Sequence, residues 1–349
     1  MSTVTIIGAG AMGSALTVPL VKNGHKVKLW GTELDDMIIE DLKNNKVHPK
    51  HKHVLPKDIE LYYSNELEKA LETSKYIIMA ITSDALGKVF ERVVPYLKSD
   101  MLIATVSKGF NYNKNKEIVI LPEILVERLP DGIKNIPIIA VGGPCKANEV
   151  VYETPTNVVY ACGDINAAKE FKEVIQTDVY NVKIDKDVIG TEISVAMKNA
   201  YAVALGFAEG FKEINGYSHN NTKSALFTIA VEEMMNLSEA LGGCKESVIG
   251  LPGIGDLEVT GEAGRNRLLG EVVGGGLTSS EAIKKMKDED ITVEGYPAIE
   301  FGYNLSLKLR VKGTLPKKGL PLLNALYSIL YQDKDCYSTI KSVLNKYWD

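Results

Sequence analysis

Residues 3–7 (TVTII) form a short, β-branched, apolar run that passes directly into the glycine-rich hexapeptide 8–13 (GAGAMG). Alanine and leucine side chains at helical spacing follow from residue 11 to about residue 23, and residues 26–30 (KVKLW) form a second apolar run. This order predicts a strand, a glycine turn, a helix and a second strand, which together make a βαβ unit. The sequence therefore predicts a doubly wound α/β fold built around this unit.

The three glycines of the hexapeptide have the spacing of a dinucleotide-binding turn. Gly8 permits the tight turn, Gly10 lets the backbone approach a pyrophosphate, and Gly13 lets the helix pack closely against the strand. The N-terminus of the helix offers free N–H groups to the phosphates. Glycine turns are common, so the spacing alone is weak, but the flanking strand and helix favour a cofactor site over a chance turn.

The composition is that of an ordinary globular protein and limits the classes of function. The chain has 349 residues, 45% of them hydrophobic and 24% charged, which excludes disordered and fibrous classes and allows two domains with separate cores. A formal net charge of -5 provides no broad basic field for nucleic acid or anionic lipid. We therefore expect neither nucleic acid nor a membrane as a partner.

The cysteines and the start of the chain predict a reducing, cytoplasmic setting. The four cysteines are far apart and form no Cys-x-x-Cys or Cys/His cluster, which argues against disulfides and against zinc. The first strand begins within three residues, which leaves no room for a signal peptide. No apolar stretch approaches the roughly 20 residues of a membrane helix. We expect a soluble protein without a metal site.

A change of pattern near residue 190 predicts two domains. Apolar runs alternate with helical segments before it, as in a parallel doubly wound sheet, and helical patterns dominate after it. The expected strands cover residues 3–7, 26–30, 59–62, 76–81, 102–106, 136–141, 157–160 and 179–182. The expected helices of the second part cover residues 192–211, 223–241, 267–273, 279–286, 297–308 and 321–330. We expect a dinucleotide-binding domain over 1–189 and an all-helical domain over 190–349.

The tract 44–56 carries three histidines, His48, His51 and His53, among lysines. Histidines at this spacing are potential metal ligands, but no carboxylate or cysteine accompanies them. We therefore expect a polar, solvated surface loop.

Ligands of open α/β sheets lie beyond the carboxyl ends of the strands, so the loops that follow strands are candidate sites. Three such loops, 81–83, 107–109 and 142–145, carry unusual residues, and Lys108 is the one charged residue among them. The spacing supports two interpretations of Lys108 equally: it contacts a ligand, or it is an exposed lysine that precedes a turn glycine.

Lys198 and Asn199 interrupt an otherwise small and apolar helical pattern. Burying a lysine is costly, and partial desolvation would make its amine a usable proton donor and acceptor near neutral pH. Taken alone, a lysine that extends to the surface from a core helix is the better supported alternative.

A second cluster strengthens the catalytic interpretation. A glycine-rich turn over 250–257 includes Asp256, and Thr260 follows four residues later, on the same face if the stretch is helical. Arg265 and Asn266 then open a helix and offer a guanidinium and an amide to a phosphate or carboxylate. Helix caps and solvated arginines explain each residue singly but explain the whole cluster less well.

These motifs, in this order, resemble the NAD(P)-dependent glycerol-3-phosphate dehydrogenases over nearly the whole chain. The matching motifs are the 8–13 hexapeptide, Ser107-Lys108-Gly109, Gly143-Pro144, Lys198-Asn199, Gly255-Asp256-Leu257, Gly264-Arg265-Asn266-Arg267 and Val293-Glu294-Gly295. The resemblance implies a Rossmann domain followed by a helical domain, usually in a homodimer. It also implies reversible reduction of dihydroxyacetone phosphate to sn-glycerol 3-phosphate.

The resemblance further implies roles for individual residues. Lys198 is similar to the family's general acid/base, with Asp256 orienting its ammonium group, and Lys108 would polarise the carbonyl or hold substrate. Arg265 and Asn266 would hold the phosphate. The implied cofactor contacts are Gly8, Gly10, Ala11, Met12, Gly13, Thr32, Glu33, Lys108, Ala147, Arg265, Val293 and Glu294. The implied substrate contacts are Lys108, Gly143, Cys145, Lys198, Asp256, Thr260, Gly264, Arg265 and Asn266.

Several positions depart from the usual family pattern. Met12 stands at a site that is generally aromatic, and Cys145 and Gly264 stand where a hydroxyl is common. Ile229 stands where bacterial members often have arginine, and 212–217 resembles an insertion. A site with fewer hydroxyl donors leaves another small polyol or ketose phosphate, or a 3-hydroxy acid, as an alternative substrate.

The choice of cofactor depends on the residues after the second strand. Residues 30–36 (WGTELDD) contain three acids and no arginine. An acid here accepts the ribose 2′-hydroxyl of NAD, whereas an arginine accommodates the 2′-phosphate of NADP. We therefore expect NAD in preference to NADP, although Glu33 and Asp35 are also suited to cap the next helix.

A non-catalytic NAD-binding sensor is an alternative from another class of protein. The presence of Lys198, Asp256 and Arg265 together counts against it, because a sensor needs none of them. The sequence favours an enzyme.

Overall fold

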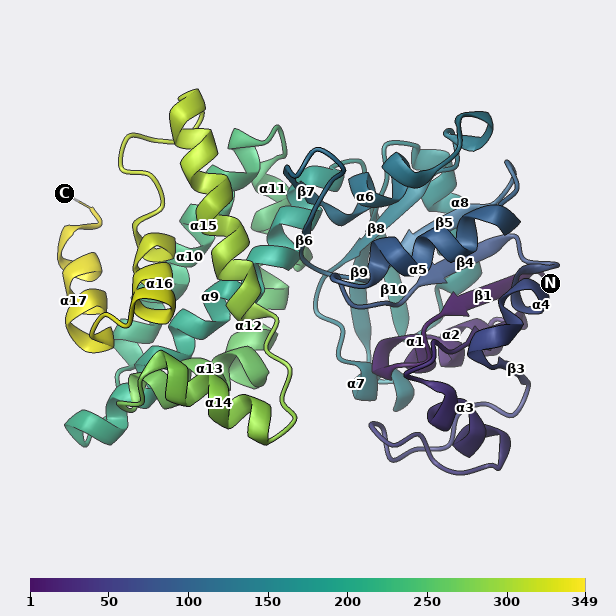
Figure 1. Cartoon of the computed structure of the whole chain (residues 1–349), viewed down its shortest axis with the longest axis horizontal. Coiled ribbons are helices and arrows are strands. Elements are labelled where there is room, and N and C mark those ends of the chain that lie inside the picture. Colours follow the sequence, from purple (N-terminus) through teal and green to yellow (C-terminus); the bar gives the residue numbers. More distant parts are fainter. Residues whose placement is uncertain (349) are drawn as a thin grey trace. The chain divides into compact units, whose positions relative to one another are not determined.

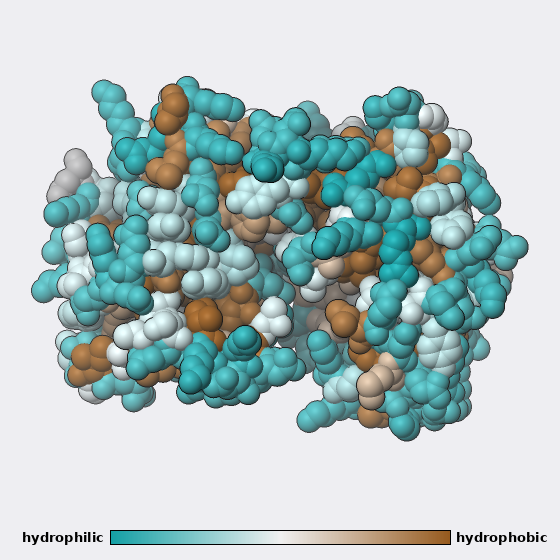
Figure 2. Space-filling view, in the orientation of Figure 1, coloured by the Kyte–Doolittle hydropathy of each residue, from teal (hydrophilic) through white to brown (hydrophobic). Residues whose placement is uncertain are grey.

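The computed structural model describes residues 1–348 and divides into two compact units, Met1–Val188 and Ile189–Asp349 (Figure 1). The first is a sheet with helices on both faces and the second is helical, so the expected fold class is confirmed. The observed division falls one residue before the expected one. Hydrophilic residues cover most of the face of each unit seen in Figure 2. Within residues 1–348 no helix is long and apolar enough to cross a bilayer.

The strand order of the main sheet places the glycine turn at a switch point. The eight strands are β1 (Thr3–Ile7), β2 (Lys26–Trp30), β3 (Ile59–Tyr62), β4 (Tyr76–Met79), β5 (Leu102–Thr105), β8 (Ile138–Gly142), β9 (Thr156–Ala161) and β10 (Tyr180–Asp185). They lie in the order β10-β9-β8-β5-β4-β1-β2-β3. Because β1 has β2 on one side and β4 on the other, residues 8–13 leave the sheet where its order reverses, which is the ligand edge of such folds.

Helices bury both faces of this sheet. One face is covered by α1 (Ala11–Ala15), α2 (Thr17–Lys22), α3 (Asp36–Lys43), α7 (Ala147–Val151) and α8 (Ile165–Ile175), and the other by α4 (Leu67–Leu71), α5 (Leu86–Val93) and α6 (Leu121–Arg128). Val4 and Ile6 of β1 belong to the first core and Ile7 to the second, as the two-residue period of a strand requires. The strand that precedes the glycine turn is therefore buried on both sides.

Two strand features differ from the all-parallel expectation. β9 runs antiparallel to β8, with Ala140 opposite Ala161, while the other pairs of the main sheet are parallel. An apolar run records burial but not strand direction, so the sequence could not show this reversal. A hairpin of β6 (Phe110–Tyr112) and β7 (Ile118–Ile120) was also not expected, because strands of three residues are too short to show alternation. The expected strands otherwise end within three residues of those observed.

The single helix expected over residues 11–23 is two helices, α1 and α2, which meet at Leu16. Pro19 has no N–H group and cannot donate to the carbonyl four residues earlier, so it is accommodated in the first turn of a new helix.

The second unit is all-helical around a long central helix. Its helices are α9 (Val188–Asn215), α10 (Asn220–Ala240), α11 (Lys245–Val248), α12 (Asp256–Glu262), α13 (Arg265–Gly274), α14 (Ser279–Asp288), α15 (Gly295–Lys312), α16 (Pro321–Gln332) and α17 (Cys336–Lys346). Nearly every α9 residue up to Phe211 is buried, as its apolar composition on all sides predicts. The expectation omitted α11, α12 and α17; the first two are short, and the third buries only Cys336 and Ile340.

Glycines allow α9 and α13 to touch backbone to backbone. A Cβ at Gly206 would lie 2.1 Å from the carbonyl oxygen of Arg267, and a Cβ at Gly270 would lie 2.0 Å from that of Val203. Gly210 and Gly274 are equally constrained one turn further along each helix. This spacing of small residues brings the helix axes closer than side chains would permit. The first turn of α13 is thereby held beside α9.

A buried carboxyl group joins three helices of the same unit. Glu233 of α10 is fully buried and accepts hydrogen bonds from the backbone N–H groups of Leu322 and Leu323 at the start of α16 (2.6 and 2.9 Å). It also accepts one from the hydroxyl of Tyr201 on α9 (2.9 Å). Burial raises the pKa of Glu233 to about 8, against the lowering effect of these three donors. The carboxyl group therefore anchors α9 one turn beyond Lys198.

Gly270→Ala tests the close helix crossing. In an unobstructed helix this change would stabilise by about 0.5–1 kcal/mol, but here the added methyl group overlaps the backbone of α9. We expect a net loss of about 2 kcal/mol or more of unfolding free energy, measured by urea denaturation. Gly163→Ala is the control, since a Cβ there meets nothing within 4 Å. Equal stability of the two variants would contradict the close crossing.

Candidate functional site

The glycine turn has the geometry that a bound pyrophosphate requires. Gly8 has a φ of +108°, which L side chains rarely adopt. A Cβ at Gly13 would lie 2.0 Å from the carbonyl oxygen of Gly8, so only glycine allows α1 to pack so near β1. A Cβ at Gly10 would meet nothing within 4 Å, so the backbone there is open to a ligand. Ala11 and Met12 continue into α1, where Met12 packs against the core.

The acid that contacts this turn is Asp35. Oδ2 of Asp35 accepts hydrogen bonds from the backbone N–H and hydroxyl of Thr32 (3.0 and 2.9 Å) and from the N–H of Ala9 (3.4 Å). Glu33 is instead exposed and pairs with Arg92 at 3.0 Å. Asp35 stands at the N-cap position of α3 without making a side-chain cap bond. Asp35 therefore joins the loop after β2 to the glycine turn.

The histidine tract is not the solvated loop that was expected. His48 and His51 are buried, with ring centroids 4.5 Å apart, and only His53 of the three is exposed. Nδ1 of His48 accepts the N–H of Lys50 (3.2 Å), so its Nε2–H is the donor to the carbonyl oxygen of Ala9 (3.1 Å). His51 Nε2 lies 2.7 Å from the carbonyl oxygen of Ala11. The polar residues of this tract suggested exposure, but the two rings turn inward to carbonyl oxygens of the glycine turn.

Lys108 lies at the carboxyl edge of the sheet. Its Nζ donates to the carbonyl oxygen of Gly143 at 3.3 Å, and the two residues follow the neighbouring strands β5 and β8. Lys108 is partly buried rather than fully exposed. Cys145 and Ala147 are also partly buried and pack against the core.

The second unit places a buried ion pair on α9. Nζ of Lys198 donates to Oδ1 of Asp256 and to the hydroxyl of Thr260, each at 2.8 Å. Lys198 and Asp256 are almost fully buried, so the lysine does not extend to the surface. A π-helical turn over Leu251–Gly255 leads into α12, and it directs Asp256 and Thr260 to the lysine from one face of that helix.

An asparagine ties three helices together beside this pair. Nδ2 of Asn266 donates to Oδ1 of Asn199 on α9 (2.9 Å), and its Oδ1 accepts the N–H of Gly295 at the start of α15 (2.8 Å). A Cβ at Gly295 would lie 2.4 Å from the carbonyl oxygen of Asn199, so glycine is required there too. These contacts occupy both ends of the Asn266 amide and leave one N–H bond for another acceptor. Asn199 is thus a positioning residue, whose role the sequence could not indicate.

Arg265 and Glu294 form an exposed pair next to Asn266. Nη2 of Arg265 lies 3.1 Å from Oε1 of Glu294, and both side chains are about half exposed. Such a pair contributes at most about 1 kcal/mol, so the guanidinium can exchange its carboxylate for another anion. Gly264 is the N-cap of α13, with an extended φ of 171°.

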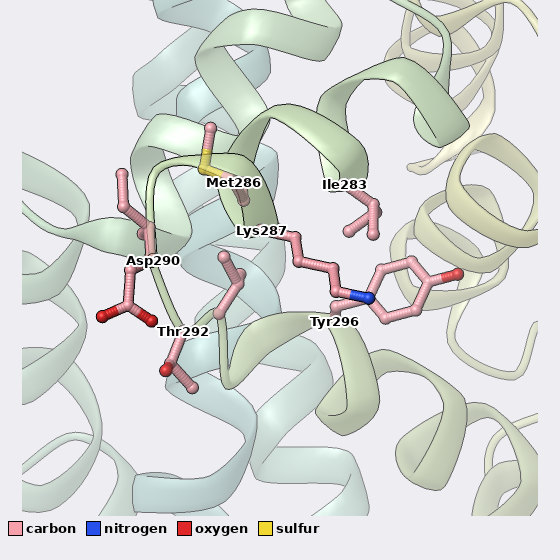
Figure 3. A pocket seen from close by; sticks show the side chains of 8 residues that line it. Ile283, Met286, Lys287, Asp290, Thr292 and Tyr296 are labelled. Atoms are coloured by element: carbon pink, nitrogen blue, oxygen red, sulfur yellow. The ribbon is translucent and has the colours of Figure 1, made fainter.

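A pocket of about 300 Å³ lies between α14 and the start of α15 and is lined by Val293 and Tyr296, among others. Figure 3 shows the side chain of Lys287 reaching toward the ring of Tyr296. Of the cofactor residues expected in this unit, Val293 borders the pocket and Glu294 follows it directly in the chain.

A Rossmann-type unit, followed by a helical unit with a buried lysine–carboxylate pair and an exposed arginine–glutamate pair, defines a two-unit dehydrogenase. Residues 3–168 match the model of the NAD-dependent glycerol-3-phosphate dehydrogenase N-terminus, and residues 187–341 match that of its C-terminus. The chain belongs to the NAD-dependent glycerol-3-phosphate dehydrogenase family.

Similar proteins agree with this assignment over almost the entire chain. An NADP(+)-dependent glycerol-3-phosphate dehydrogenase of Archaeoglobus fulgidus is 37% identical, covering 94% of this chain and 95% of its own. A glycerol-3-phosphate dehydrogenase (NAD(P)+) of Clostridium tetani is 33% identical, covering 98% and 92%. The solved structure of glycerol-3-phosphate dehydrogenase from Coxiella burnetii matches with a TM-score of 0.83 at 27% identity and covers 99% of both chains.

The histidine contacts predict a pH-dependent stability. Burial lowers the pKa of His48 and His51 below the ordinary 6.5, so the fold keeps both rings neutral. The unfolded chain then binds more protons, and stability falls as the pH drops below about 6.5 and through the folded pKa values. Lys50 and the neighbouring His53 add a repulsion that acts in the same direction.

The double variant His48→Gln/His51→Gln keeps amide donors for the two carbonyls and removes the titrating rings. We expect it to flatten the fall in unfolding free energy between pH 6.5 and pH 5, followed by urea denaturation at each pH. His53→Gln is the matched control and should keep most of the slope, because burial lowers the pKa of His51 more than the repulsion from His53 does. A slope that persists in the double variant would assign the effect to other groups.

Proposed function

We propose that this chain reduces dihydroxyacetone phosphate to sn-glycerol 3-phosphate with NAD(P)H, reversibly, and that Lys198 is its general acid/base. The observation that carries the proposal is the buried Lys198, held by Asp256 and Thr260 at 2.8 Å, in a chain of this family. Asp256 and Thr260 together hold the ammonium group of Lys198 in a defined orientation.

The chemistry needs one hydride and one proton. Residues 8–13 would hold NAD(P)H, which would supply the hydride to the carbonyl carbon. As the C=O π bond breaks and the C–H bond forms, Lys198 gives a proton to the oxygen, so that an alcohol and not an alkoxide is produced. The amine stays bound to Asp256 and Thr260 and regains its proton from solvent. In the reverse direction it accepts the proton from the alcohol.

The remaining site residues are proposed to bind substrate and cofactor. Arg265 exchanges Glu294 for the substrate phosphate, with the free N–H of Asn266 as a second donor. Lys108 at the sheet edge polarises the carbonyl or holds substrate. The departures at Cys145 and Gly264 remove hydroxyl donors, but they leave these charged groups intact.

The cofactor class is NAD(P), and the relatives include an enzyme named for NADP(+) and others named for NAD(P)+. Asp35 beside the glycine turn supports binding of the NAD ribose. A cytoplasmic homodimer is our proposal for the working form, supported by the family resemblance alone.

Lys198→Met tests the catalytic proposal. We expect kcat to fall by about 10²-fold or more, because no group delivers the proton, while NADH binding measured by fluorescence stays near normal. Lys212→Met removes an exposed lysine from the same helix and should keep full activity. Unchanged turnover in Lys198→Met would refute the assignment.

Arg265→Ala tests the phosphate contact. We expect KM for dihydroxyacetone phosphate to rise about tenfold or more through loss of a charge-assisted hydrogen bond. Dihydroxyacetone, which has no phosphate, should be affected far less in the same variant. An unchanged KM of Arg265→Ala for dihydroxyacetone phosphate would point to an unphosphorylated substrate. Assays with longer ketose phosphates and 3-keto acids would then measure which substrate the enzyme prefers.

A further inference from the structure

An arginine reaches the end of β2, although the sequence after that strand contains none. Arg92 comes from α5, more than fifty residues later in the chain, and its guanidinium carbon lies 5.0 Å from the ring centroid of Trp30, the last residue of β2. Its Nη2 donates to the carbonyl oxygen of Ser64, just after β3 (3.1 Å), and its Nη1 donates to Glu33 (3.0 Å). The guanidinium is therefore fixed between the loops that follow β2 and β3.

These loops lie at the edge of the sheet where the adenosine ribose of a dinucleotide binds. Asp35 turns its carboxylate to Thr32 and to the glycine turn, and Asp36 accepts from the N–H and hydroxyl of Ser64. The acids at positions 35 and 36 are thus engaged by donors of their own.

Glu33 differs from these two acids because its contact is easily exchanged. Its side chain is 65% exposed and that of Arg92 is 38% exposed. An ion pair with this much solvent contact contributes about 1 kcal/mol or less. A phosphate monoester carries more charge than a carboxylate and fits the planar guanidinium with two parallel hydrogen bonds.

We propose that Arg92 is the residue that receives the 2′-phosphate of NADP, and that Glu33 competes with this phosphate and so tunes the preference between NADP and NAD. The inference rests on the proposed use of NAD(P). It replaces the expectation that a loop without arginine selects NAD, because the fold brings the arginine from another helix. With NAD, the Glu33–Arg92 pair stays closed.

The test compares cofactors in three variants. Arg92→Leu keeps an apolar contact on Trp30 but removes the charge, and we expect it to lower kcat/KM for NADPH about tenfold or more relative to NADH. Glu33→Gln frees the guanidinium and should shift the ratio toward NADPH. Lys88→Met is the matched control, since it removes an exposed positive charge from α5 and should leave the ratio unchanged.

Nucleotide binding gives a second readout that does not need turnover. Calorimetry with 2′,5′-ADP and with 5′-AMP should show that Arg92→Leu loses affinity for 2′,5′-ADP alone. An equal loss for both nucleotides, or none for either, overturns the proposal. If the wild-type chain reduced dihydroxyacetone phosphate with neither cofactor, the proposed function would fail, while these binding data would still decide the role of Arg92.

Discussion

The close crossing of α9 and α13 is the constraint on which the helical unit depends. Two glycines on each helix remove the side chains that would separate them, and the carbonyl of Val203 occupies the space that a Cβ at Gly270 would need. The crossing sets Asn266, in the first turn of α13, against Asn199, and Asn266 in turn holds the start of α15 through Gly295. The lysine on α9 therefore lies in a scaffold fixed by backbone contact, which tolerates little displacement.

The two units supply different chemistry by different physical means. In the first unit, glycine conformations and open backbone prepare a surface for phosphates, and buried histidines hold the turn by its carbonyl oxygens. In the second, a charge is buried with its partner, so that one ammonium group is held in a defined orientation. Exposed pairs, Arg265–Glu294 and Glu33–Arg92, are weak enough to open for a ligand anion.

Much of the fold could be predicted from the sequence because buried strands and helices show characteristic patterns of apolar residues. The runs of β1 to β5 and the long apolar pattern of α9 are examples. The spacing of glycines predicted the turn, and the order of the motifs indicated the family. The direction of β9 and the division of α1 from α2 could not be predicted in this way. The direction of β9 depends on how the connection from β8 returns to the sheet. The division of α1 from α2 depends on the missing N–H group of Pro19.

The sequence by itself determined the fold class, the glycine turn and the residue types of the candidate site, because these depend on local conformation and on motif order. Only the tertiary structure decided which acid faces the turn, that His48 and His51 are buried, and that Arg92 reaches the end of β2. Each of these contacts joins residues distant in the chain, or turns a polar side chain inward to satisfy a backbone group. Such choices depend on which unpaired donors and acceptors the folded chain brings together, and no local pattern records them.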